Sequence, residues 1–381
     1  MATADPSSNT SELALFRETV RRFVDDELVP NEAQWRRQQY VDRAAWRKAG
    51  DLGLLLCAVP DELGGVGADM RYEAVVYEEL ARGGAMGFGK HVHEIVAHYL
   101  VGYGTPEQRQ RWLPKLASGE SVAAIAMSEP GAGSDLQGIR TRAVRDGGHY
   151  VINGSKTFIS NGYIADLVLL VCKTDPQAGA KGTSLIMIET TGLAGFRRGR
   201  ILDKIGQKAQ DTAELFFDDV RVPLSHLLGN EEGRGFYQLM QQLPFERTII
   251  AVTAVAVMER AVELTAAYAK ERRAFGKALI EMQNTRFKLA ECKTIARVAR
   301  VFVDDCVRKL MDGTMDAATA SMAKWWTTDM QCQVVDECLQ LFGGYGYMLD
   351  FPIAQMYADS RVQKIYGGTN EIMKELIARG L

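Results

Sequence analysis

Glu246 is the residue whose surroundings point most directly to chemistry. It stands in the segment 243–247, where an acidic side chain follows Pro244 in an otherwise apolar helical stretch. Because proline removes a helical N–H and frees a carbonyl, the helix is predicted to be distorted there. Burial would raise the pKa of the carboxyl above its ordinary value of about 4.3, which suits a general base. The alternative is a surface feature in which Glu246 and Arg247 carry no chemistry.

Two further segments have residue types that suit a flat, polar ligand. Residues 125–135 combine glycines, which let backbone N–H groups approach a ligand, with the hydroxyls of Ser128 and Ser134. In residues 156–162, Phe158 is predicted to cover a flat ring and Ser160 to hydrogen-bond the edge of that ring. Taken singly, the first segment also fits a glycine-rich surface loop, and the second also fits a half-buried edge strand.

Two more segments suit anionic or carbonyl oxygen. The basic run 272–277, with Gln283 shortly after it, suits a pyrophosphate, although it could equally complement the dipole at the end of a helix. In residues 365–372, two glycines precede a helix start, where free N–H groups favour such oxygens. The alternative there is an ordinary N-cap formed by Thr369 or Asn370.

The elements that must position these residues change period along the chain. Residues 1–10 are predicted to be a flexible tail, and residues 11–121 to be helical, with Ser11 as an N-cap. An apolar stripe at three- and four-residue spacing supports that helix: Leu13, Phe16, Val20, Phe23 and Val24. Residues 233–381 return to helix, with Ile250, Ala254, Val257 and Ala261 on one face and Gly343-Gly344 able to end a later helix.

The middle region, residues 122–232, has strand character. Asn153-Gly154 between two β-rich triplets predicts a hairpin turn at that point, and further strands are predicted at 167–172, 184–188 and 214–217. Without long helices between them, these strands favour an antiparallel sheet. No G-x-G-x-x-G follows a strand, so a dinucleotide would have to be held by something other than a Rossmann unit.

Composition narrows the function classes. With 45 basic against 48 acidic residues, nothing indicates a nucleic-acid or anionic-membrane partner. The longest apolar stretch is too short to span a membrane, and the N-terminus lacks targeting features, which predicts a cytoplasmic protein.

The six cysteines form no C-x-x-C pair and are expected to be reduced and buried. The pair His91 and His93 is interpreted as structural, and no metal site is expected.

In this order, the five segments resemble the acyl-CoA dehydrogenase family over nearly the whole chain, nearest to its long-chain and isovaleryl-CoA branch. Many members of the family carry the catalytic glutamate between the positions of Tyr366 and Gly368, where this sequence has Gly367. The long-chain and isovaleryl branch places its glutamate on a helix after the middle domain, and Glu246 occupies that place. The resemblance therefore identifies Glu246 as the base that removes the α-proton while flavin N5 accepts a hydride from Cβ.

The resemblance implies a mainly helical fold with a helical N-terminal domain, a β middle domain and a C-terminal four-helix bundle, in a homo-oligomer that is usually a tetramer. It implies FAD as the cofactor, an acyl-CoA as the substrate and electron-transfer flavoprotein as the electron acceptor. Gly367 is expected to donate its backbone N–H to the thioester oxygen. The residues implied for FAD in the same subunit are Ile125, Ala126, Met127, Ser128, Gly133, Ser134, Phe158, Ile159, Ser160, Thr369, Asn370 and Glu371. Those implied for the FAD of a neighbouring subunit are Arg272, Phe275, Gln283, Gln340, Leu341, Gly343 and Gly344. Those implied for the substrate are Ser134, Tyr237, Phe245, Arg247, Gly367 and Gly368.

Several alternatives stay open from the sequence. The same reaction could run on a thioester of an acyl carrier protein. A flavin monooxygenase or oxidase would share the fold, but a monooxygenase would not need the base. A non-catalytic helical binding scaffold would be colourless. Gly83, Gly84, Gly87 and Gly89 fall where the family lines its acyl pocket, or else they form part of a plain loop.

Overall fold

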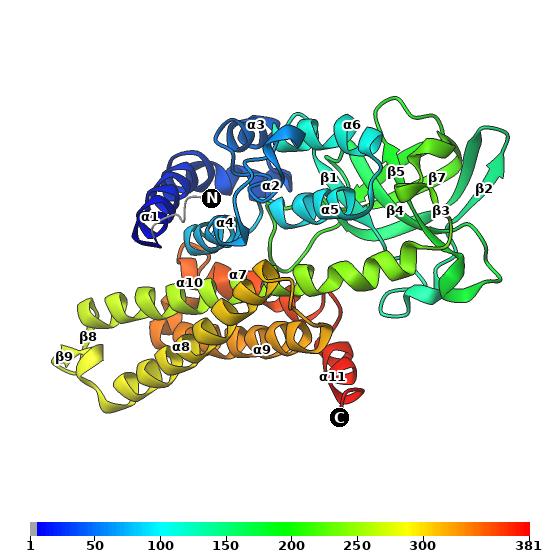
Figure 1. Cartoon of the computed structure of the whole chain (residues 1–381). Helices are drawn as coiled ribbons and strands as arrows, with labels where there is room; N and C mark the ends of the chain where they lie inside the picture. The colour runs from blue at the N-terminus through cyan, green and yellow to red at the C-terminus, as the bar shows by residue number, and fades with distance from the viewer. Residues whose placement is uncertain (1–5) are drawn as a thin grey trace.

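Helices occupy both ends of the chain and a β-sheet occupies its middle, as the change of sequence period predicts (Figure 1). The structure is a computed structural model in which residues 6–381 are described. In those residues no helix is long and apolar enough to cross a membrane.

The N-terminal region is helical. Its first helix begins at Pro6, so Ser11 lies inside that helix and the prediction of Ser11 as N-cap is wrong. Residues 6–10 of the predicted tail are helical in the structure, while residues 1–5 lie outside the described part of the chain. The apolar stripe behaves as predicted, because Val20, Phe23 and Val24 are buried. The helices of this region are α1 (Pro6–Phe23), α2 (Glu32–Gln38), α3 (Arg43–Asp51), α4 (Met70–Gly83), α5 (Lys90–Tyr103) and α6 (Pro106–Ala117).

The middle region folds into a seven-stranded sheet with the order β1-β4-β2-β3-β7-β6, in which β5 pairs with β4. Pairing is mostly antiparallel, but β1 runs parallel to β4. β2 also pairs with β4 in the parallel sense, through the single residue pair Arg142–Lys173. The sheet is therefore mixed, which corrects the purely antiparallel expectation. The strands are β1 (Ala123–Ala126), β2 (Arg142–Asp146), β3 (His149–Ser160), β4 (Leu167–Lys173), β5 (Thr183–Glu189), β6 (Phe196–Ile201) and β7 (Thr212–Pro223).

The hairpin predicted at Asn153-Gly154 is wrong. Both residues lie inside the continuous strand β3, where the register with β7 shifts between Ile152 and Gly154. The turn comes earlier, at Gly147-Gly148, and joins β2 to β3. Gly154 has a φ of 151° and packs closely against Thr141, where a Cβ would collide. Glycine is therefore needed at this β-bulge for its backbone conformation and for close packing.

The C-terminal region holds three long helices and shorter ones packed against them. In the described residues the helices of this region are the long α7 (Gly235–Glu271), α8 (Gln283–Met311) and α9 (Ala317–Phe342) and the short α10 (Pro352–Ser360) and α11 (Asn370–Ala378). The small hairpin of β8 (Arg273–Ala274) and β9 (Lys277–Ala278) joins α7 to α8. As predicted, α9 ends at Phe342, and Gly343 follows with a φ of 58°.

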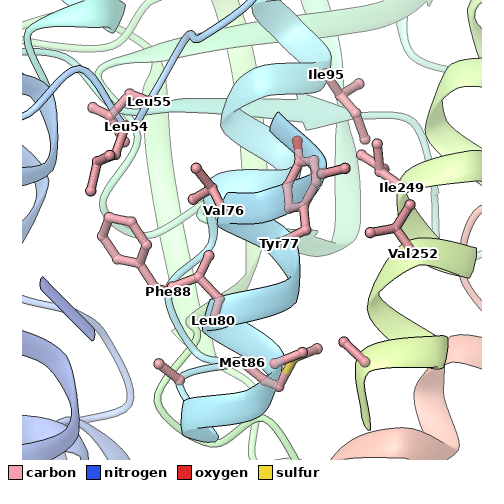
Figure 2. Packing of buried hydrophobic residues seen from close by; sticks show 14 of the residues in the cluster. Leu54, Leu55, Val76, Tyr77, Leu80, Met86, Phe88, Ile95, Ile249 and Val252 are labelled. Atoms are coloured by element: carbon pink, nitrogen blue, oxygen red, sulfur yellow. The ribbon is translucent and has the colours of Figure 1, made fainter. Parts of the chain in front are cut away.

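The core that positions the site lies where α4 and α5 meet α7. Figure 2 shows Tyr77 of α4 and Ile95 of α5 facing Ile249 and Val252 of α7. All four side chains are buried in one apolar cluster. The N-terminal helices are therefore fixed against the helix that carries Glu246.

Two sequence interpretations are settled by the local contacts. The Nδ1 of His93 accepts the N–H of Ala123 at 3.1 Å and its Nε2 donates to the carbonyl of Leu116 at 3.0 Å, while His91 contacts Thr253 Oγ1 at 2.8 Å. Both histidines are thus structural, as interpreted. All six cysteines are free thiols, and only Cys332 is not fully buried.

Candidate active site

Glu246 is buried in α7, as the sequence predicts, and only 5% of its surface is exposed. The hydroxyl of Tyr99 on α5 donates to Glu246 Oε1 at 2.9 Å. Burial raises the pKa of Glu246 to about 7, against smaller lowering effects of the Tyr99 hydrogen bond and the charge of Arg247. The alternative of a surface Glu246–Arg247 feature is wrong, because Arg247 is buried as well. A carboxyl that titrates near neutral pH suits proton abstraction.

The glycine turn that precedes α11 is tied to the same helix. Arg247 donates from Nε to the carbonyl of Gly367 at 3.5 Å and from Nη1 to Ser321 Oγ at 3.2 Å. Gly367 and Gly368 have φ values of 64° and 89°, which glycine adopts without steric cost. In the described chain, the N–H of Gly367 has no backbone hydrogen-bond partner, so it remains able to donate to a ligand.

Residues 126–134 leave the end of β1 and run beside β3. Thr157 donates its N–H to the carbonyl of Ser128 at 3.0 Å, and the buried Lys156 ammonium donates to the carbonyl of Met127 at 2.8 Å and to Glu129 at 2.9 Å. The loop of the first segment is therefore fixed to the strand of the second. The structure brings these two predicted segments together.

Phe158 is the unusual residue of that strand. Its ring is 69% exposed and its φ is 59°, a conformation that costs a large side chain free energy, and it lies at a register shift between Lys156 and Ile159. Ile159 beside it is buried and Ser160 is half-buried. Within the loop of residues 126–134, Gly131 and Gly133 face open space. An exposed aromatic ring held in a strained conformation is typical of a ligand surface.

The N-terminus of α11 carries the last predicted segment. Thr369 is the N-cap and accepts the N–H of Ile372 at 3.4 Å, so the alternative of an ordinary N-cap applies to it. The side chain of Asn370 is buried and bonded to Lys324, Thr328 and Asp329, which leaves only its backbone for a ligand. The side chain of Glu371 is exposed.

The basic cluster lies at the other end of α7 (Figure 1). From Glu246 to Glu271 the helix rises about 38 Å, so Arg272 cannot join Glu246 in one pocket of a single chain. Arg272 lies over the ring of Tyr345, which follows Gly343-Gly344, and Phe275 is 95% exposed with a φ of 52°. The residues predicted to reach a neighbouring subunit lie in this distal region, where α7 and α9 end and α8 begins: Arg272, Phe275, Gln283, Gln340, Leu341, Gly343 and Gly344.

The residues predicted to contact substrate are placed differently from one another. Ser134 is exposed, and Tyr237 is 51% exposed and accepts a hydrogen bond from Gln241 at 2.5 Å. Phe245 is buried, and its ring stacks on His98 with centroids 3.8 Å apart. Phe245 and Arg247 are thus both buried, and their contact with a substrate stays a prediction.

The four glycines near α4 divide into two pairs. Gly83 and Gly84 line a cavity of about 700 Å³ between α4, α7, α10 and residues 21–36 of the N-terminal region. A Cβ at Gly87 would collide with Ala209 and one at Gly89 with Asn161, whose amide also donates to the carbonyl of Gly89 at 2.8 Å. The second pair therefore serves close packing and leaves no space for an acyl chain.

Tyr99 is a residue of the site that sequence reasoning missed. It lies in an apolar helix with no motif around it, and its contact with Glu246 joins residues 147 positions apart. Only the packing of α5 against α7 reveals it.

Comparison with known proteins covers almost the whole chain. Three family descriptions match in order, namely the acyl-CoA dehydrogenase N-terminal domain at residues 10–120, the middle domain at 124–220 and the C-terminal domain at 233–381. The long-chain specific acyl-CoA dehydrogenase of Mus musculus is 49% identical over 97% of this chain and 86% of its own length. The isovaleryl-CoA dehydrogenase of Solanum tuberosum is 35% identical over 96% and 89%, respectively.

Solved structures agree with these relatives. An acyl-CoA dehydrogenase from Geobacillus kaustophilus has a TM-score of 0.94 at 47% identity, and the match covers 97% of each chain. A glutaryl-CoA dehydrogenase from Mycobacterium smegmatis, solved in complex with FADH2, has a TM-score of 0.90 at 28% identity over 97% of this chain and 94% of its own.

Proposed function

The chain belongs to the acyl-CoA dehydrogenase family, and we propose that it oxidises a saturated acyl-CoA thioester to the trans-2-enoyl-CoA with Glu246 as the base. The observation that carries this proposal is the buried Glu246 carboxyl, hydrogen-bonded to Tyr99 and adjacent in sequence to the arginine that contacts the Gly367 turn.

The residues of the β domain fit FAD. The exposed ring of Phe158 offers a face for a flat heterocycle, and the open space at Gly131 and Gly133 lets backbone N–H groups approach it. The first turn of α11, from Thr369 to Glu371, offers free N–H groups from the C-terminal region. When bound, FAD supplies the hydride acceptor for Cβ.

Glu246 and Gly367 have different roles in removing the α-proton, the first as base and the second as hydrogen-bond donor. Glu246, ionised above pH 7, removes the α-proton, and the negative charge that develops on the thioester oxygen needs a donor. The N–H of Gly367 supplies it, and one such donor contributes about 3 kcal/mol to transition-state stabilisation. Arg247 and Lys324 bond the carbonyls of Gly367 and Gly368, so the glycine turn that carries this N–H is held in place before the substrate binds.

The cavity beside Gly83 and Gly84 supports a long acyl chain as substrate. Its lining includes the apolar side chains of Met86, Val257 and Leu264 beside charged side chains such as Arg21, Glu79 and Arg260. Val257 lies on the same face of α7 as Glu246, three turns and about 17 Å further along the helix. A short chain bound at Glu246 would not extend that far.

A volume-filling substitution tests the chain-length proposal. Val257→Phe should lower kcat/KM for long acyl-CoA substrates and spare short ones, because only long chains reach the cavity. Val298→Phe, on the exposed face of α8, is the matched control and should leave the profile unchanged. An equal loss at every chain length would contradict the proposal.

The Glu246→Gln variant tests the reaction itself. The purified variant should be yellow yet fail to bleach when an acyl-CoA is added without oxygen, whereas wild type bleaches. Bleaching retained by the variant would remove Glu246 from the mechanism, and colourless wild-type protein would favour the non-catalytic scaffold. Comparing acyl-CoA with the same acyl group on an acyl carrier protein decides the carrier.

The acceptor, assembly and location remain predictions. Electron-transfer flavoprotein is expected as the electron acceptor, and a homo-oligomer, usually a tetramer in this family, is expected because the distal cluster cannot reach the site of its own chain. The cytoplasmic location predicted from the sequence is untested, and the mouse and potato relatives are described as mitochondrial.

A further inference from the structure

Tyr99 contacts Glu246 in the interior of the protein, where α5 packs against α7. Tyr99 is fully buried on α5, and its hydroxyl lies 2.9 Å from Oε1 of Glu246, 5% of whose surface is exposed. A phenol hydroxyl can donate one hydrogen bond, and this one is directed to a single carboxylate oxygen. The second oxygen, Oε2, has no protein donor among the described residues, and it is not enclosed by the protein.

We infer that Tyr99 is a positioning residue for Glu246, whose hydroxyl fixes Oε1 so that Oε2 faces the substrate. This inference rests on the proposed role of Glu246 as base. It assigns to Tyr99 no contact with substrate or cofactor.

The helix that carries Tyr99 is anchored on both sides. Towards α4, the buried ammonium of Lys90 pairs with Glu94, which also accepts the hydroxyl of Tyr77. Towards α7, His91 contacts Thr253 at 2.8 Å. Because buried polar contacts have strict geometry, α5 has one register on its neighbours. Tyr99 therefore meets Glu246 as part of a rigid contact.

His98, the residue before Tyr99, reinforces the same geometry. Its ring stacks on Phe245, the residue before Glu246, at 3.8 Å and 22°. On its other side His98 lies 3.4 Å from the buried carboxylate of Glu73 on α4. Two neighbouring contacts therefore join α5 to α7: His98 contacts Phe245, and Tyr99 contacts Glu246.

The groups around Glu246 leave Tyr99 as its nearest donor. Burial raises the pKa of Glu246, and the Tyr99 hydrogen bond and then the charge of Arg247 lower it. From α7, the guanidinium of Arg247 is directed to Gly367 and Ser321, and from α9 Lys324 is bonded to Gly368 and Asn370. From α5, Tyr103 is bonded to Gln241 at 3.1 Å, and from α4 the carboxylate of Glu73 faces His98.

Tyr99→Phe tests the inference, because it removes one hydroxyl and keeps the ring. Without the donor, the pKa of Glu246 rises, and the acid limb of the pH profile of kcat/KM should move about one to two pH units higher. At pH 7, kcat should fall about fivefold to fiftyfold, while KM for the acyl-CoA stays near that of wild type. Above the shifted limb, kcat should recover towards the wild-type value.

Tyr103→Phe is the matched control on the same helix, and its acid limb should coincide with that of wild type. An infrared spectrum gives a second readout that does not depend on turnover. The protonated-carboxyl band that Glu246→Gln abolishes should persist to higher pH in Tyr99→Phe than in wild type.

The outcomes separate this inference from the proposed function. If Glu246→Gln fails to bleach but Tyr99→Phe leaves both the acid limb and the infrared titration unchanged, the positioning role is refuted and the function stands. A kcat loss in Tyr99→Phe with an unmoved acid limb also refutes it, since loss of a hydrogen bond to the ionised carboxylate must raise the pKa of Glu246. If Glu246→Gln still bleaches, the proposed function itself fails.

Discussion

Glu246→Gln should stabilise the fold while abolishing the proposed activity. The pKa of Glu246 is about 7 in the folded protein against an ordinary value of 4.5. A difference of about 2.5 pH units corresponds to about 3 kcal/mol. Since the folded-state pKa of this acid is raised, folding opposes ionisation. Below pH 4.5 both states are protonated and nothing is lost, whereas above pH 7 the full destabilisation is present.

Glutamine has nearly the same shape, can still accept the Tyr99 hydrogen bond and does not titrate. The gain in stability of Glu246→Gln over wild type should therefore grow from near zero at pH 4.5 to about 3 kcal/mol at pH 8. Thermal unfolding midpoints, followed by circular dichroism at saturating FAD from pH 5 to 8.5, measure this difference. It should reach several degrees at the alkaline end.

The control is Glu271→Gln, at the exposed end of the same helix. Its difference from wild type should stay small at all pH values, because the side chain is solvated in both states. A Glu246→Gln curve that runs parallel to wild type across the pH range would refute the reasoning, since it would mean that the carboxyl has no raised pKa in the folded protein.

Three further substitutions test other parts of the site. Arg272→Ala should lower the flavin-to-protein ratio after gel filtration, and an unchanged ratio would leave this arginine only a helix-dipole role. Lys324→Met leaves the carbonyl of Gly368 without its 2.7 Å donor, which should destabilise the protein by about 1–3 kcal/mol, measured as a lower unfolding midpoint. Gly367→Ala would place a Cβ 2.6 Å from Ile250 Cδ1 at a φ of 64°, so kcat should fall while flavin content stays, and normal kcat would contradict the proposed donor.

Local patterns were sufficient for much of the fold. Apolar spacing predicts the buried face of α7, because Ile250, Ala254, Val257 and Ala261 each follow from one helical period and are all buried. Glu246 in that stretch also stands out in the sequence, because a charged residue inside an apolar run is recognisable without knowledge of the fold. In both cases, the information lies within a few turns of one helix.

Features that depend on pairing between distant segments were not predictable. Two turn signals, at 147–148 and 153–154, compete for one hairpin, and only the alignment of β3 with β2 and β7 selects the first. The contact of Tyr99 with Glu246 depends on how α5 packs against α7, which no local pattern encodes. Likewise, the missing side chains of Gly87 and Gly89 suggest space for a ligand in the sequence, but in the structure Ala209 and Asn161 occupy that space.

The length of α7 has a consequence for genetics. One continuous helix carries Glu246 and leads into Arg272, and it rises about 38 Å between them. If the distal cluster binds the FAD of a neighbouring chain, Glu246 and Arg272 of one chain therefore belong to different active sites. Two inactive chains, one Glu246→Gln and the other Arg272→Ala, should then complement each other. In a mixed pair, the intact glutamate of one chain meets the intact arginine of the other, and one working site returns.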